Sequence, residues 1–323
     1  MLGAGCSPGR WPTRKPNLGA LLTCYCERLT KRGSASGSKV RALFRRHIEV
    51  PFPRLWVSRA RTIQSADLMA PIDRLVEQEK LPTARKLRAA LHAAFEVAIQ
   101  SPRCARSAEF RRFRIAVNPV SQIRSVESDR PLPERVLSVA ELRALWGYLS
   151  EMRCVRGPVL RFYLLTGAQR LEQLLRAMRD DLMEEGLVLW DKKGRRQRPR
   201  RHVVPLIAPA RLALMAMGRS GPHVVSTDRG RSGLHPSTIW RYVAGVSDAL
   251  LKEGLIQSSV SPSDLRRTVE TRLAALGVSP AVRAQLQSHG LEGVQARHYD
   301  RYGYLEEKRQ ALERFYALVS ASV

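Results

Sequence analysis

Acidic residues are scarce in this sequence, and the deficit says more about its partners than about its fold. The 323 residues include 29 Asp and Glu but 55 Lys and Arg, which gives a formal net charge of +26. Such a surplus indicates a polyanionic partner, because each Lys or Arg that neutralises a phosphate releases condensed counterions. Nucleic acid is favoured over an anionic lipid surface, since arginines recur through the segments predicted to fold.

Cysteines and long apolar runs are also few. The five cysteines are an odd number at scattered positions, and they form neither a disulfide framework nor a zinc-binding CxxC pair. This pattern favours a reducing compartment. No apolar run approaches the ~20 residues that a membrane-spanning helix needs, so no membrane partner is expected. With 44% hydrophobic residues the chain can still bury a sizeable core, and its length suggests two domains.

Residues 1–59 show no sustained apolar period. They contain the Gly- and Pro-rich stretches SPGRWP and KRGSASGSK. We therefore predict an irregular basic segment here, with little core of its own.

A helix is predicted over residues 81–100. Apolar residues recur there at every fourth position and share one helical face: Leu87, Leu91, Phe95 and Ile99. Together with the segment 67–79, this helix predicts a small all-helical domain over residues 60–128. Basic side chains fall away from the apolar face and are candidates for DNA binding: Arg85, Lys86 and Arg88.

A polar, Pro-interrupted stretch over residues 121–133 predicts a linker. The second domain then begins at Ser138 and Glu141, which match a capping box at the start of a helix. Gly167 is expected just past the end of a helix formed by the apolar run 159–165. Two short strands and further helices follow: strands over 187–190 and 202–205, and helices over 237–253, 265–276, 280–288, 291–300 and 306–319. The predicted fold class is mainly α with a small β insert, and the second domain covers residues 135–323.

Five short motifs of the second domain carry residues suited to phosphate chemistry. They are Thr-Gly-Ala-Gln-Arg ending at Arg170, Lys193-Gly194, Asp-Leu-Arg-Arg-Thr around Arg266, Ser-His-Gly around His289 and Arg-His-Tyr-Asp-Arg around Tyr299. His289 follows Arg266 by 23 residues, and Tyr299 follows His289 by 10. This order and spacing resemble the tyrosine recombinase family of phage and genomic-island integrases. The resemblance covers residues 135–318 and, more loosely, the preceding helical segment as the family's core-binding domain.

The resemblance implies an active site that breaks a DNA phosphodiester by transesterification. Arg170 and Arg266 would stabilise charge on the phosphoryl oxygens as planar, permanently charged donors. Tyr299 would attack phosphorus and form a 3′-phosphotyrosine bond, so that resealing needs no ATP. Lys193 would protonate the leaving 5′ oxygen, and His289 would hydrogen-bond a phosphoryl oxygen. Neither a metal ion nor another cofactor is expected.

Some positions leave alternatives open. Lys192 could serve as the acid in place of Lys193. Ser263, counted here among the catalytic positions, stands where the family commonly has a His, three residues before Arg266. Serine can hydrogen-bond a phosphate oxygen but cannot act as a general base near neutral pH. The loop arginines would follow phosphates near the cleavage site, or else form a merely solvated charged run: Arg195, Arg196 and Arg198.

A two-domain clamp on DNA is the architecture that the resemblance implies. The core-binding and catalytic domains would close around a double-stranded attachment site, with a homo-tetramer as the working assembly, in the cytoplasm on the bacterial nucleoid. Residues 1–59 would be the remnant of an arm-binding domain. The alternatives are a catalytically impaired DNA-binding protein derived from an integrase, and a DNA-relaxing enzyme like the type IB topoisomerases. A stripe in the last predicted helix suits packing on a neighbouring protomer or within its own chain: Leu312, Phe315, Leu318 and Val319.

Overall fold

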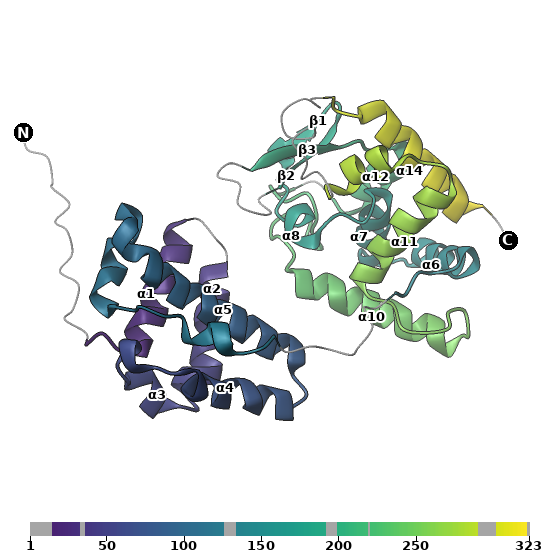
Figure 1. Ribbon diagram of the computed structural model, residues 1–323. Coiled ribbons are helices and arrows are strands. Elements are labelled where there is room, and N and C mark those ends of the chain that lie inside the picture. The colour runs from purple at the N-terminus through teal and green to yellow at the C-terminus, as the bar shows by residue number, and fades with distance from the viewer. Residues whose placement is uncertain are drawn as a thin grey trace, which may run out of the picture. The chain divides into compact units, whose positions relative to one another are not determined.

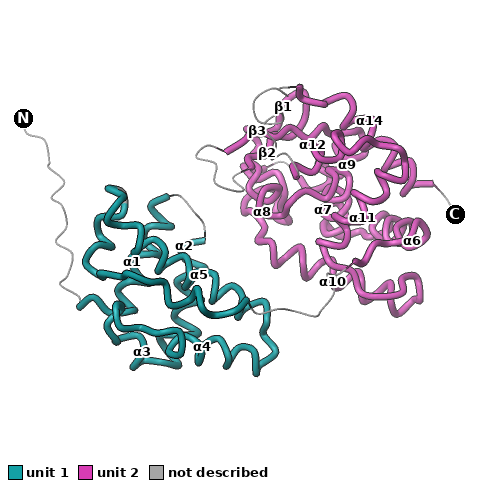
Figure 2. The backbone as a smooth tube through the Cα atoms, in the orientation of Figure 1, with its two compact units in different colours: residues 1–131 teal, residues 132–323 magenta. Residues whose placement is uncertain are grey.

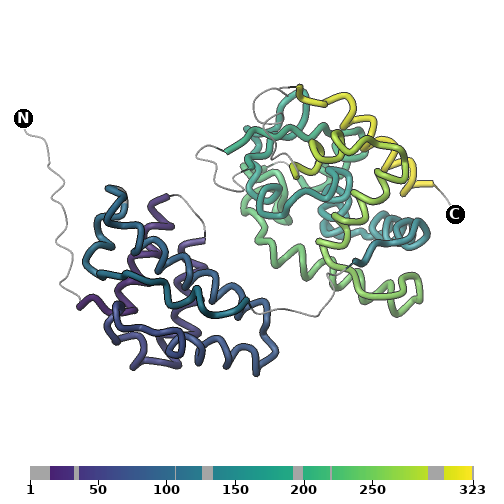
Figure 3. Tube along the Cα trace, viewed as in Figure 1, coloured from purple at the N-terminus to yellow at the C-terminus, as the bar shows by residue number. Residues whose placement is uncertain are grey.

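The chain divides into two compact units, residues 1–131 and 132–323 (Figure 2). A computed structural model describes residues 15–32, 36–125, 134–191, 199–218, 220–289 and 302–321. Each unit has its own hydrophobic core. Figure 3 follows the chain through both units.

Unit 1 is helical (Figure 1). Its longest helix, α5 (Leu81–Gln100), packs against α1 and α4, and the predicted apolar face of α5 supplies buried core residues. Its bounds are those expected from the four-residue apolar period, so this prediction is confirmed. In chain order the helices are α1 (Leu18–Lys31), α2 (Ser36–Phe44), the π-helix η1 (Arg45–Glu49), α3 (Pro53–Val57), α4 (Ser65–Glu77) and α5 (Leu81–Gln100), with the 3₁₀ segments η2 (Ala60–Thr62), η3 (Ser101–Arg103), η4 (Ala105–Phe113) and η5 (Pro119–Gln122).

The prediction of an irregular segment over residues 1–59 is wrong for its described residues. Asn17 caps α1 by accepting a hydrogen bond from the Ala20 amide at 2.8 Å, and Leu18 and the leucines one turn later are fully buried. Gly19 does not interrupt this helix. A Cβ atom at Gly19 would lie 2.4 Å from the Trp56 ring, so the glycine allows the indole to pack directly on the helix backbone.

Unit 2 is mainly α with one small sheet, which confirms the predicted fold class. Its strands are antiparallel in the order β1-β2-β3, with Leu187 opposite Val204 and Asp191 opposite Arg200. Its elements are α6 (Val139–Glu151), α7 (Arg156–Leu165), α8 (Leu171–Leu174), η6 (Arg179–Asp181), β1 (Leu182–Met183), β2 (Gly186–Asp191), β3 (Arg200–Val204), α9 (Ala208–Ala216), α10 (Pro236–Lys252), α11 (Pro262–Ala275), α12 (Pro280–Gln287) and α14 (Leu305–Ser320).

The helices predicted in unit 2 are found where they can be compared, with ends that differ by up to three residues. The helix predicted from residue 265 begins at Pro262, and α9 was not predicted. Ser138 and Glu141 form the expected capping box of α6. Gly167 follows the end of α7 with φ +81°. The helix predicted over residues 291–300 lies outside the described residues.

The last helix, α14, packs within its own chain. Four side chains of its apolar face are buried in the core of unit 2: Ala311, Leu312, Phe315 and Val319. Arg143 of α6 donates from Nε to the Leu318 carbonyl at 3.0 Å. Of the two placements expected for the apolar stripe, the structure therefore shows the one in its own chain.

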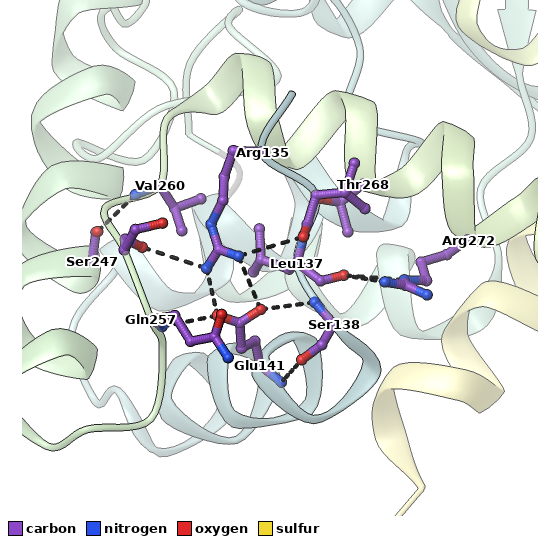
Figure 4. A network of polar contacts seen from close by, with 11 residues as sticks. Arg135, Leu137, Ser138, Glu141, Ser247, Gln257, Val260, Thr268 and Arg272 are labelled. Carbon is purple, nitrogen blue, oxygen red and sulfur yellow. Dashed lines mark hydrogen bonds and ion pairs between the residues drawn. The ribbon is translucent and has the colours of Figure 1, made fainter. Parts of the chain in front are cut away.

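A polar network holds the first described residues of unit 2, which begin at residue 134 (Figure 4). Arg135 forms an ion pair with Glu141, which also accepts hydrogen bonds from the amides of Ser138 (2.8 Å) and Gln257 (2.9 Å). Burial opposes ionisation of Glu141, but the hydrogen bonds from Arg135 and from these two amides outweigh it and lower the pKa of Glu141 to about 2.

The same network joins residues 135–137, which precede α6, to α11. The Leu137 amide donates to the Thr268 hydroxyl at 3.0 Å, and Arg272 donates to the Leu137 carbonyl at 2.6 Å. Arg267 donates to the Arg135 carbonyl at 3.0 Å. These hydrogen bonds hold residues 135–137 against one side of α11 (Figure 4).

Candidate active site

A tight turn after α7 positions Arg170. Gly167 and Ala168 both have left-handed backbone conformations, with φ of +81° and +48°. The amides of Gly167 and Ala168 donate to carbonyl groups of α7 and so close its last turn, and α8 begins one residue after Arg170. Gln169 is fully buried and joins the turn to α12 by donating from Nε2 to the Leu286 carbonyl at 2.8 Å.

The Arg266 side chain, on α11, contacts the same turn after α7. Its Nη1 donates to the Ala168 carbonyl at 2.8 Å, and its Nη2 donates to the Gln287 carbonyl. Arg170 donates from Nη1 to the neighbouring Ser288 carbonyl at 2.8 Å. The two guanidinium groups therefore bind consecutive carbonyl groups where α12 ends.

The two cations affect each other electrostatically. Burial is the main cause that lowers the pKa of Arg266 to about 10, and the nearby Arg170 lowers it further. Arg266 is still cationic at neutral pH. An anion bound by both guanidinium groups would offset their mutual repulsion.

His289 lies directly after this pair of carbonyls. Ser288 ends α12 in a left-handed conformation (φ +51°). The His289 side chain that follows lies close to α11. Its Nε2 lies 3.8 Å from Oε2 of Glu270, which is four residues after Arg266 on the same helix. The structure thus brings Arg170, Arg266 and His289 to one place.

A buried carboxylate also belongs to this cluster. Asp191 ends β2 and is 3% exposed. Its Oδ2 accepts a hydrogen bond from the Ser288 hydroxyl at 2.7 Å and lies 3.8 Å from Nη1 of Arg170, while its Oδ1 accepts from Gln173 at 2.8 Å. Nothing in the sequence distinguished Asp191 from a surface charge, since it ends a strand beside a basic loop.

Solved structures of integrases share this fold. A lambda integrase (residues 75–356) dimer bound to a COC′ core site matches with a TM-score of 0.60 and 20% identity, over 84% of this chain and 95% of that one. The Tn1549 transposon integrase (residues 82–397) with circular intermediate DNA matches with a TM-score of 0.61 and 18% identity, over 91% of this chain and 99% of that one. The chain has the tyrosine recombinase fold. No family model and no curated protein matches the chain.

Several of the site residues predicted from the resemblance to tyrosine recombinases lie outside the described residues. They are the nucleophile Tyr299, both candidate acids Lys193 and Lys192, and the loop arginines Arg195, Arg196 and Arg198. Their roles stay predictions.

Ser263 lies in the first turn of α11 and is exposed. It is three residues before Arg266, so it stands on the helix that carries one of the two converging guanidinium groups. Its role also stays a prediction. Among the residues that the structure describes, no group of three or more His, Cys, Asp or Glu could hold a metal ion.

The basic residues predicted on α5 differ in their surroundings. Arg85 and Lys86 are exposed. Arg88 is only partly exposed, and its Nε donates to the Ile123 carbonyl at 2.7 Å, so it helps to hold the end of unit 1 onto α5. DNA binding by these three residues is not tested by the fold. None of the helices in the described part of the chain has the length and apolar character needed to cross a membrane.

Proposed function

We propose that this chain is a site-specific DNA recombinase that cleaves and rejoins DNA through a 3′-phosphotyrosine intermediate. The observation that carries the proposal is the convergence of Arg170 and Arg266 on consecutive carbonyl groups beside His289. Two arginines held together, one of them largely buried, suit a site whose ligand is an anion. A DNA phosphodiester is an anion of the size that two guanidinium groups can bind.

The proposed reaction uses these groups in one step. The Tyr299 phenol gives up its proton to water as its oxygen attacks phosphorus, and the bond from phosphorus to the 5′ oxygen breaks. Lys193 or Lys192 gives a proton to the departing oxygen. Arg170 and Arg266 stabilise the charge that develops on the non-bridging oxygens, and His289 hydrogen-bonds one of them. Attack by a 5′ hydroxyl on the phosphotyrosine reverses the step and reseals a strand.

The DNA partner is proposed from the charge of the chain and from the fold. A lambda integrase tetramer bound to a Holliday junction matches this chain with a TM-score of 0.57 and 20% identity, over 84% of this chain and 77% of that one. We propose that this chain also binds double-stranded attachment sites and works as a homo-tetramer. Such a partner would place it in the cytoplasm, on the nucleoid.

Covalent trapping tests the proposal. Randomised duplexes would first be enriched for those that the Tyr299→Phe variant binds, and would then be nicked at staggered positions. The wild type should form an adduct that survives SDS, and Tyr299→Phe should form none. Tyr302→Phe is the matched control, because Tyr302 is 61% exposed and close in sequence but has no proposed catalytic role.

The other outcomes identify the alternatives. DNA binding without an adduct from the wild type would indicate an impaired, integrase-derived DNA-binding protein. Relaxation of supercoiled plasmid without any strand exchange would indicate an enzyme like the type IB topoisomerases.

A further inference from the structure

We propose that Asp191 is a positioning residue, which holds Arg170 and Ser288 in the geometry needed to bind the reacting phosphate. This inference rests on the proposed function and adds to it a residue that the motifs of the sequence do not contain.

Asp191 closes a ring of contacts with Arg170 and Ser288. Its Oδ2 accepts from the Ser288 hydroxyl at 2.7 Å and lies 3.8 Å from Nη1 of Arg170. That same Nη1 donates to the Ser288 carbonyl at 2.8 Å. One nitrogen of Arg170 is therefore held between the carboxylate and the peptide that precedes His289.

Further contacts hold the carboxylate itself. Gln173, one turn after Arg170, donates from Nε2 to Oδ1 of Asp191 at 2.8 Å. Arg200, opposite Asp191 on β3, donates from Nη2 to the Ser288 hydroxyl oxygen at 2.7 Å. The Ser288 hydroxyl thus accepts from one strand of the hairpin and donates to the other. Asp191, at the end of β2, is therefore the side chain through which the sheet contacts both α8 and the end of α12.

The charge of Asp191 matters because the cluster is otherwise cationic. Arg170, Arg200 and Arg266 all lie in it, and Asp191 is a buried negative group in contact with the first of them. Removing one partner of a buried ion pair leaves the other charge without its compensation. Arg170 would then be drawn toward solvent or toward other acceptors, and away from Ser288.

Asp191 is placed to act through Arg170 and not on the substrate. It is 3% exposed, and both of its oxygens accept hydrogen bonds from protein side chains. A carboxylate engaged in this way is a poor acceptor for the proton of a tyrosine, but it is a strong anchor for a guanidinium group.

The test separates the reaction rate from DNA binding. Asp191→Asn keeps the size of the side chain and an acceptor oxygen for Ser288 but removes the charge. Glu185→Gln is the control: it removes one negative charge from the turn between β1 and β2, where Glu185 is exposed and pairs with the exposed Arg201. The measurements are the single-turnover rate of adduct formation at saturating protein, the Kd for the enriched duplex and the Tm.

Asp191→Asn should slow adduct formation by roughly tenfold or more, because small misplacements of a catalytic group have effects of this size. Its Kd should stay within about threefold of wild type, since many phosphate contacts set the affinity. Glu185→Gln should change the rate and the Kd by less than about twofold, because exposed ion pairs contribute little. Ser288→Ala should slow the reaction too, and the double variant should be less impaired than the two separate effects combined.

Two results would overturn the role of Asp191 while leaving the proposed function intact. The first is a wild-type rate for Asp191→Asn alongside a wild type that forms the adduct. The second is a parallel loss of rate, affinity and Tm, which would make Asp191 a structural residue only. A wild type that forms no adduct would instead overturn the proposed function, and this inference with it.

Discussion

Protonation of Glu141 should weaken unit 2 in a narrow acidic range. The pKa of Glu141 falls from an ordinary value near 4.5 to about 2 in the folded chain. Each tenfold change in proton affinity corresponds to about 1.4 kcal/mol, so this carboxylate contributes about 3 kcal/mol to folding when it is ionised. Its side chain is only 8% exposed, so solvent screens this contribution little.

The sign of the pH dependence follows from the direction of the pKa. Because the folded pKa lies below the unfolded one, the contribution is complete above about pH 5 and is lost as the pH falls toward 2. In Glu141→Gln there is no carboxylate to protonate. The wild type should therefore lose about 3 kcal/mol more than Glu141→Gln over this range.

Denaturant unfolding followed by tryptophan fluorescence measures this difference, because three of the five tryptophans, Trp146, Trp190 and Trp240, lie in unit 2. Near neutral pH, Glu141→Gln should be less stable than wild type by about 2–3 kcal/mol, because Arg135 loses its partner (Figure 4). Equal pH dependence of the two proteins between pH 5 and 2 would refute the network as the cause.

Three further outcomes are expected. Gly19→Ala should destabilise unit 1 by about 1–3 kcal/mol, because its Cβ would collide with the Trp56 ring, whereas Gly147→Ala, with open space around its Cβ, should be neutral or slightly stabilising by urea unfolding. Arg170→Lys and Arg266→Lys should each lower the single-turnover rate of adduct formation by about 100-fold, since lysine cannot reproduce the planar set of donors, and a rate near wild type for either would remove that residue from the site. Affinity for DNA should fall by orders of magnitude between about 50 and 200 mM salt in a filter-binding titration, and an affinity that does not respond to salt would argue against phosphate contacts.

Local patterns in the sequence predicted local structure well. The four-residue period of α5 and the Ser138 capping box depend on neighbouring residues alone, and both are found as expected. The helices of residues 18–57 were missed because glycine and proline were interpreted as breakers. At Gly19 the glycine instead makes room for Trp56, which is 37 residues away, and no local pattern contains that contact.

The candidate site was predictable only in part, for the same reason. Motif spacing selected Arg170, Arg266 and His289, and the structure places them together. Asp191 comes to the site only because the turn after α7 and the end of α12 meet the hairpin. Arg88 was selected as a basic residue off the apolar face, but its hydrogen bond to the Ile123 carbonyl depends on a contact 35 residues away that no local pattern contains.

The identity of the residue that carries the nucleotide tests the central claim most directly. After trapping, the adduct would be digested with nuclease and trypsin, and the modified peptide would be sequenced by mass spectrometry. We predict a single nucleotide on Tyr299, attached through its 3′ phosphate. A nucleotide on Tyr302 or Tyr304, or an adduct that persists in Tyr299→Phe, would contradict the account.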